Sequence, residues 1–205
     1  MAATGTAEAS SGPARLRLFV AIALPSDWRR YLAACQQDLE RLAPGYARWV
    51  TTELMHLTLV FLGEQPSGRL PAVQDAVSAA AAGQSAFTLA LGRLGHFGGS
   101  APRVLWVEAH AAGGGLTRLH AALCEQLVAR EIPFDRKPLV PHLTLGRARR
   151  DAPPAAGRLL ASRLPTLRLP DPPRAFHVEA VHLVRSELSP RGPRYTALAE
   201  YRLAT

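Results

Sequence analysis

The 205-residue sequence is poor in cysteine, lysine and aromatic residues. Its two cysteines, Cys35 and Cys124, are far apart and outside any motif, which argues against a disulfide framework and predicts reduced thiols. Lys137 is the sole lysine, so arginine supplies the other basic side chains. Aromatic residues make up only 6%, which disfavours the aromatic-rich platforms that bind single-stranded nucleic acids.

Long apolar segments are also missing. No run reaches the ~18 residues that a membrane helix requires, and the N-terminus lacks the basic start and apolar stretch of a secretory signal. We therefore expect a soluble, cytoplasmic protein with no membrane partner. Residues 1–14 carry small residues without apolar periodicity, which predicts a disordered tail and a folded domain over residues 15–205.

The sequence contains no recognisable motif for a metal or a nucleotide cofactor. It has neither His-Glu-x-x-His nor Cys-x-x-Cys, the common zinc-binding patterns. Residues 113–115 are three consecutive glycines, but the Lys-Ser/Thr pair of a phosphate-binding loop does not follow them. We expect no metal and no cofactor.

The charge is strongly one-sided. The 24 basic and 16 acidic residues give a net charge of +8, which favours a polyanionic partner because it concentrates phosphate-bearing ligands near the surface. An arginine-rich, alanine-rich composition is equally typical of a GC-rich genome, so the charge supports a nucleic-acid partner without establishing one.

One pattern of strand and helix occurs twice. Short apolar runs at 17–23 and 103–108 predict strands, and each is followed by a helical pattern, at about 28–42 and 115–130. Each helix then leads to a strand that opens with His-Leu-Thr-Leu. Both His56 to His142 and Arg17 to Arg103 are separated by 86 positions. This internal repeat predicts two similar lobes related by a pseudo-twofold axis. Further helices are expected at 68–82 and 157–163, and further strands at 87–94, 176–184 and 195–203.

The repeated His-x-Thr motif has a chemical meaning on a strand. Alternate side chains share a face, so His56 and Thr58 lie ~6.6 Å apart on one face while the leucines face a core. Two such strands across a cleft bring together two imidazoles and two hydroxyls. Histidine can act as proton donor or acceptor near neutral pH, and threonine can hydrogen-bond to a phosphate. The pattern therefore predicts metal-independent cleavage of a phosphodiester.

The other histidines have no symmetric partner. We interpret these five histidines as structural or surface residues: His96, His110, His120, His177 and His182. A single His-x-Thr motif without its repeat would be interpreted in the same way.

Five segments of the sequence resemble the two-histidine phosphoesterases, and within them the RNA 2′,3′-cyclic phosphodiesterases, also called 2′-5′ RNA ligases. The resemblance extends from Arg17 almost to the C-terminus. The segments are RLFVAIALP, ELMHLTLVFLG, RVLWVE, PLVPHLTLGRAR and VHLVRSELSPRGPRYTALAEYRL. The resemblance implies an α+β fold of two pseudo-symmetric lobes, each an antiparallel sheet with helices on its outer face, and an active site in the cleft between them.

The resemblance also implies roles for individual residues. His56, Thr58, His142 and Thr144 match the catalytic tetrad, with His56 as general acid and His142 as general base. Arg147 matches an arginine that contacts the phosphate in relatives. Phe19 is a candidate for lining the substrate cleft, although plain core packing explains an apolar residue there equally well.

The implied function is hydrolysis of RNA 2′,3′-cyclic phosphate ends to 2′-phosphomonoesters. The partner would be such an RNA end or a small cyclic nucleotide, and we expect a monomer. Two alternatives stay open: ATP-independent 2′-5′ ligation of RNA in the same cleft, and a basic RNA-binding module without catalysis.

Overall fold

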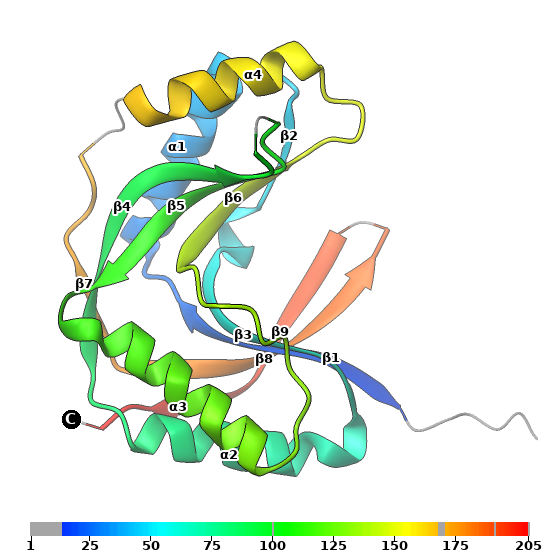
Figure 1. Cartoon of the computed structure of the whole chain (residues 1–205), viewed down its shortest axis with the longest axis vertical. Helices are drawn as coiled ribbons and strands as arrows, with labels where there is room; N and C mark the ends of the chain where they lie inside the picture. Colours follow the sequence, from blue (N-terminus) through cyan, green and yellow to red (C-terminus); the bar gives the residue numbers. More distant parts are fainter. Residues whose placement is uncertain (1–13, 100, 168–170, 191, 205) are drawn as a thin grey trace, which may run out of the picture.

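The computed structural model describes residues 14–99, 101–167, 171–190 and 192–204 (Figure 1). The expected disordered tail therefore lies outside the described residues, apart from Ala14. The fold belongs to the α+β class, as predicted. Within the described segments, no helix combines the length and the apolar character needed to cross a bilayer.

Nine strands and four α-helices make up the described fold, joined by short 3-10 turns. The strands are β1 (Arg15–Ala23), β2 (Ala47–Trp49), β3 (His56–Pro66), β4 (Phe87–Phe97), β5 (Val104–Ala111), β6 (His142–Ala148), β7 (Phe176–Val178), β8 (Ala180–Ser189) and β9 (Gly192–Arg202). The helices are α1 (Ser26–Leu42), α2 (Leu70–Ala82), α3 (Gly115–Ala129) and α4 (Pro154–Arg163). The 3-10 turns are Thr52–Leu54, Ser67–Arg69, Ala112–Gly114 and Leu164–Thr166.

The strands form one strongly curled sheet in the order β7-β4-β5-β6-β3-β1-β8-β9, with β2 paired to β6 (Figure 1). Its two halves have matching orders, β3-β1-β8-β9 and β6-β5-β4-β7, and all these strand pairs are antiparallel. The halves meet where β3 pairs with β6, at Leu57 opposite Leu143. The two His-Leu-Thr-Leu segments are thus neighbours at the centre of the sheet.

The prediction of a single strand over residues 176–184 is wrong. Glu179 separates two strands, and they belong to opposite halves: β7 pairs with β4, whereas β8 pairs with β1. Val178 and Val181 are both buried although they are three positions apart, so the period of two characteristic of one continuous strand is broken between them. This crossing lets the C-terminal segment complete both halves.

The helices also cross between the halves. α2 and α3 pack together over the half that contains β3, β8 and β9 (Figure 1). α1 follows β1 of that half along the chain but packs against β6 of the other, where the Gln36 side-chain amide donates to the Leu145 carbonyl at 2.8 Å. The two halves are therefore interleaved along the sequence and do not correspond to consecutive segments.

The leucines of the repeated motif fix which face of the central strands is buried. Leu57 and Leu59 on β3 are 0% and 4% exposed, and Leu143 and Leu145 on β6 are 1% and 0% exposed. All four belong to the main hydrophobic core. The prediction that these leucines face a core is confirmed, and it places the intervening histidines and threonines on the other face.

Candidate active site

The pairing of β3 with β6 gathers the four predicted polar residues around one point. Leu57 and Leu143 are partners and point into the core, so the residues beside each of them project from the opposite face. Because the strands are antiparallel, His56 and Thr144 lie on one side of this pair, and Thr58 and His142 lie on the other. The set has an approximate twofold symmetry, and all four side chains are half-buried.

Both histidines make the same backbone hydrogen bond. His56 donates Nδ1–H to the Leu54 carbonyl at 2.7 Å, and His142 donates Nδ1–H to the Val140 carbonyl at 2.7 Å. Since a carbonyl only accepts, these bonds assign the proton of each neutral ring to Nδ1. The Nε2 atoms are then left to exchange protons with a ligand.

Burial is the main influence on both imidazoles. It lowers the pKa of His56 and of His142 below the ordinary value of 6.5, because a charged ring is poorly solvated there. The hydrogen bonds to the Leu54 and Val140 carbonyls act in the opposite direction and favour the charged rings. The third influence differs: the charge of His142 lowers the pKa of His56, whereas the charge of Arg147 lowers that of His142.

Arg147 lies on β6, five positions after His142, with an exposed side chain. Besides its effect on His142, its charge favours the ionised form of Tyr195, although burial dominates and raises the pKa of that tyrosine. Arg147 therefore lies close to residues from both halves of the sheet. This is a suitable position for a cation that contacts an anion bound between the two histidines.

Aromatic rings flank each histidine. Phe19 stacks on His56 at 4.8 Å between ring centroids, and Tyr195 meets the same imidazole edge-on at 5.3 Å. On the other side, Phe97 meets His142 edge-on at 5.0 Å and Trp106 lies 6.3 Å from it. Such contacts restrict the rotation of the imidazoles and shield them from water.

Sequence reasoning missed three of these four rings. Tyr195 and Trp106 stand inside segments that carried the family resemblance, RGPRYTAL and RVLWVE, but no spacing rule connects them to a histidine. Phe97 ends a strand that was expected to stop at residue 94. Only the register of the neighbouring strands brings these three side chains to the site.

Phe19 lies on the same side of the sheet as the histidines and is 3% exposed. With Ala21 and Val184 it forms a small cluster separate from the main core, and Tyr195 packs against that cluster. The side chain is therefore covered by its neighbours, and it contacts the His56 ring rather than open solvent.

Two of the remaining histidines have contacts away from the four His-x-Thr residues. His120 lies 3.6 Å from the Cys124 sulfur, and His182 lies 3.2 Å from a Glu200 carboxylate oxygen. In the described part of the chain, no three His, Cys, Asp or Glu side chains come together in a group that could hold a metal ion.

Two curated relatives share most of this chain. An RNA 2′,3′-cyclic phosphodiesterase of Thermus thermophilus is 34% identical over 197 residues, covering 92% of this chain and 90% of the relative. One of Geobacillus stearothermophilus is 31% identical over 192 residues, covering 92% of this chain; the match spans only 58% of that longer relative.

Solved structures agree in fold. A crystal structure of a Thermus thermophilus protein superposes with a TM-score of 0.74 at 33% identity, covering 92% of this chain and 98% of the other. Escherichia coli LigT, crystallised with 3′-AMP, superposes with a TM-score of 0.69 at 26% identity, covering 93% and 99% of the two chains. A family model also matches residues 24–190, a span that contains both His-x-Thr motifs. The chain belongs to the 2′-5′ RNA ligase superfamily.

Proposed function

We propose that this protein hydrolyses 2′,3′-cyclic phosphate ends of RNA and leaves a 2′-phosphomonoester. The observation that carries the proposal is the twofold arrangement of His-x-Thr motifs around the Leu57–Leu143 pair, with both Nε2 atoms available. The names of the curated relatives support it, because each of the two described above is an RNA 2′,3′-cyclic phosphodiesterase.

His142 is the general base and His56 the general acid in this proposal. His142 Nε2 takes a proton from water, whose oxygen bonds to phosphorus. The bond from phosphorus to the 3′-oxygen breaks, and that oxygen takes a proton from His56 Nε2–H while the phosphate stays on the 2′-oxygen. The Arg147 charge supports the base assignment, because a nearby cation favours the neutral form of His142.

The other site residues bind the phosphate or hold the histidines. Thr58 and Thr144 donate hydrogen bonds to the non-bridging phosphate oxygens and keep phosphorus in line for attack. Arg147 supplies a positive charge to the same anion. Phe19 positions His56 by ring stacking, and so acts on the substrate cleft through that imidazole.

The superfamily name favours 2′-5′ ligation as a second candidate activity. It uses the same residues: the 5′-hydroxyl of another RNA replaces water as the nucleophile, and the 3′-oxygen leaves as before. With a cyclic end and a 5′-hydroxyl end both present, the ratio of joined to hydrolysed product measures which reaction dominates.

One chain supplies both histidines and both threonines, so we propose that the monomer is the active form. A small 2′,3′-cyclic nucleotide contains the same ring as an RNA end and is a second candidate substrate. With RNA ends as the proposed substrate, we propose that the protein acts in the cytoplasm.

The test is to incubate the purified protein with a short RNA that bears a 2′,3′-cyclic phosphate, with EDTA present. We expect a 2′-phosphomonoester, because the 3′-oxygen is the leaving group. We expect activity to persist in EDTA, because proton transfer is assigned to two histidines and no step is assigned to a metal. The position of the product phosphate is read by phosphorus NMR.

A 3′-phosphomonoester would show that the other ester bond breaks. Activity that disappears in EDTA and returns with Zn²⁺ or Mg²⁺ would overturn the metal-independent mechanism. Binding of RNA without turnover, retained after replacement of both histidines and weakened steeply by salt, would favour a non-catalytic RNA-binding module.

A further inference from the structure

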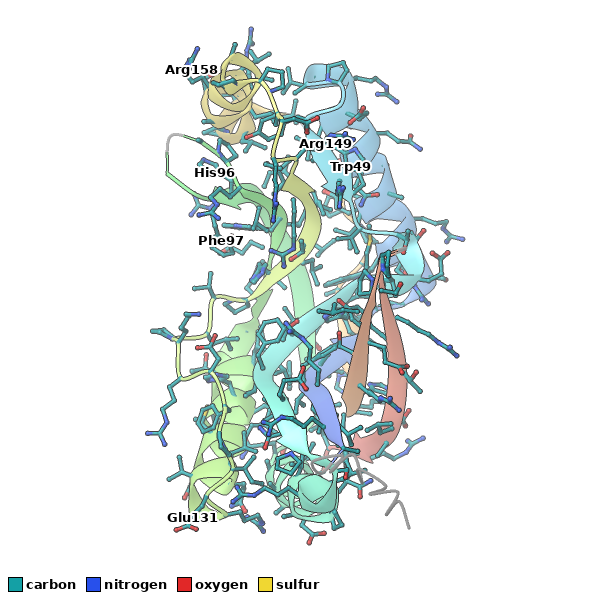
Figure 2. All side chains as sticks on the ribbon, turned by 90° about the vertical axis from the view of Figure 1, so that its right-hand side faces the viewer. Trp49, His96, Phe97, Glu131, Arg149 and Arg158 are labelled. Carbon is teal, nitrogen blue, oxygen red and sulfur yellow. The ribbon has the colours of Figure 1, made fainter. Side chains whose placement is uncertain are left out.

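A basic pocket of about 590 Å³ opens at the C-terminal end of β6, and one of its lining residues, Phe97, contacts the second histidine. Four arginines line it: Arg103 just before β5, Arg147 within β6, and Arg149 and Arg150 just after β6. All four arginines are exposed. In Figure 2, Arg149 and Phe97 both lie in the upper part of the view, below the helix that carries Arg158.

The charge of this pocket is mostly uncompensated. Arg149 lies 3.2 Å from an Asp151 carboxylate oxygen. Within the described ranges, Arg103, Arg147 and Arg150 form no ion pair, and no carboxylate lines the pocket. Several guanidinium groups in one hollow repel one another, and a bound anion relieves that repulsion. Phosphate suits them because its oxygens match the paired N–H groups of a guanidinium.

The pocket and the surroundings of His142 share two residues, Phe97 and Arg147. Phe97 lines the pocket and also meets the His142 imidazole edge-on at 5.0 Å. Arg147 lines the pocket and lies near enough to His142 for its charge to act on that ring. A ligand that occupies both places therefore extends from the phosphate between the histidines, past His142, into the arginine pocket.

An aromatic ring beside several cations is the combination that binds single-stranded nucleic acid, since the ring stacks with a base and the cations bind the backbone. Phe97 is half-buried and rests against Trp106, with 5.3 Å between the ring centroids. Its position supplies one stacking surface within the arginine pocket. Aromatic residues are few in this sequence, but Phe97 lies where an RNA strand that leaves the active site would pass.

We propose that the arginine pocket binds the nucleotide that adjoins the cyclic-phosphate end, with its base against Phe97 and its phosphodiester on Arg103, Arg149 and Arg150. The inference rests on the proposed function and narrows its substrate: the enzyme selects an RNA strand over a cyclic mononucleotide. A mononucleotide can fill the space between the histidines, but it leaves the arginine pocket empty.

The test compares kcat/KM for adenosine 2′,3′-cyclic phosphate with kcat/KM for a trinucleotide that ends in the same group. We expect the wild-type protein to prefer the trinucleotide by at least about tenfold, because each charged hydrogen bond to phosphate contributes roughly that factor or more. The variant R103Q/R150Q should lose most of this preference and retain its rate on the mononucleotide. Raising the salt concentration should reduce turnover of the trinucleotide selectively.

The double variant R158Q/R163Q is the matched control, since it removes two exposed arginines from α4, outside the pocket. It should leave both substrates unaffected. Equal kcat/KM for the two substrates in the wild-type protein, or a preference that survives in R103Q/R150Q, would overturn the inference. If neither substrate is hydrolysed, the proposed function fails and the inference with it.

A binding measurement covers the case in which R103Q/R150Q does not fold. The wild-type protein should bind a trinucleotide with a 2′-phosphate end more tightly than it binds 2′-AMP, by a similar factor. Equal affinities would count against the pocket as a nucleotide subsite.

Discussion

At the scale of single residues, His56 and His142 each donate Nδ1–H to the carbonyl of the residue two positions earlier. The two motifs thus share this backbone hydrogen bond as well as their sequence, and both rings have Nε2 available for a ligand. Their surroundings differ: Arg147 acts on His142, whereas Phe19 and Tyr195 enclose His56. A reaction with one entering and one leaving group requires such an inequality, because one imidazole must start neutral and the other protonated.

A substrate with sulfur in place of the 3′-bridging oxygen distinguishes the two roles. Each histidine replaced by alanine should lower kcat/KM on normal RNA by about 10²–10⁴-fold. The sulfur substrate should restore His56→Ala largely, because a thiolate leaves without a proton. It should not restore His142→Ala, because the attacking water still lacks its base.

Steady-state rates of the two variants on both substrates provide the measurement, with circular dichroism as the check on folding. Rescue of His142→Ala alone would reverse the assignment. Rescue of neither variant, with normal RNA binding, would mean that the imidazoles position the phosphate and do not transfer protons.

At the scale of elements, β4 and β5 support the second histidine through one close approach. Gly95 on β4 pairs with Trp106 on β5, and the Trp106 ring lies across the glycine. A Cβ at Gly95 would overlap that ring. The absence of a side chain at Gly95 therefore lets Trp106 occupy its place beside Phe97 and His142.

Gly95→Ala should displace the Trp106 ring and disturb the site without abolishing the fold. We expect a loss of about 1–3 kcal/mol in the free energy of unfolding, the usual cost of overpacking, together with a lower kcat/KM. Urea denaturation and the hydrolysis assay measure the two effects. Gly68→Ala is the control, because a Cβ there meets no atom within 4 Å. Equal behaviour of the two variants would contradict this account of Gly95.

At the scale of the whole molecule, the site exists only where the two interleaved halves meet. The main core continues through both halves and includes Leu57 and Leu143 at the junction. Opening the junction would expose core residues of both halves. The histidines beside it are consequently held in a partly desolvated place, which couples their protonation to folding.

The stability of the protein should fall when the pH drops below about 6.5. Burial holds the pKa of His56, His142 and His120 below 6.5 in the folded chain. Between these lowered values and 6.5 the unfolded chain binds more protons than the folded one, so acid favours unfolding and stability rises with pH. Urea denaturation at pH 7.5, 6.5 and 5.5 measures this slope.

The double variant His56→Asn/His142→Asn should show a shallower slope, because asparagine keeps an N–H donor but does not titrate here. His120 would account for part of the slope that remains. A slope that the double variant does not reduce would show that the two imidazoles are not coupled to folding.

The sequence alone determined most of the elements and the chemistry of the motifs. Helices α1, α2 and α3 and the two His-x-Thr strands lie close to where periodicity and the constant spacing of 86 residues put them. These features are local: the period of a strand decides that Leu57 and Leu59 are buried, and hence that His56 and Thr58 face the other way.

The tertiary structure alone decided how these elements pair. Nothing local shows that the segment 176–184 divides between two halves, or that α1 packs on the half that does not contain β1. The same holds for the rings of Tyr195, Phe97 and Trp106, which reach the histidines through the register of neighbouring strands. Register depends on contacts between residues far apart in the chain, and the arginine pocket forms for the same reason, because Arg103 meets Arg147 only through the pairing of β5 with β6.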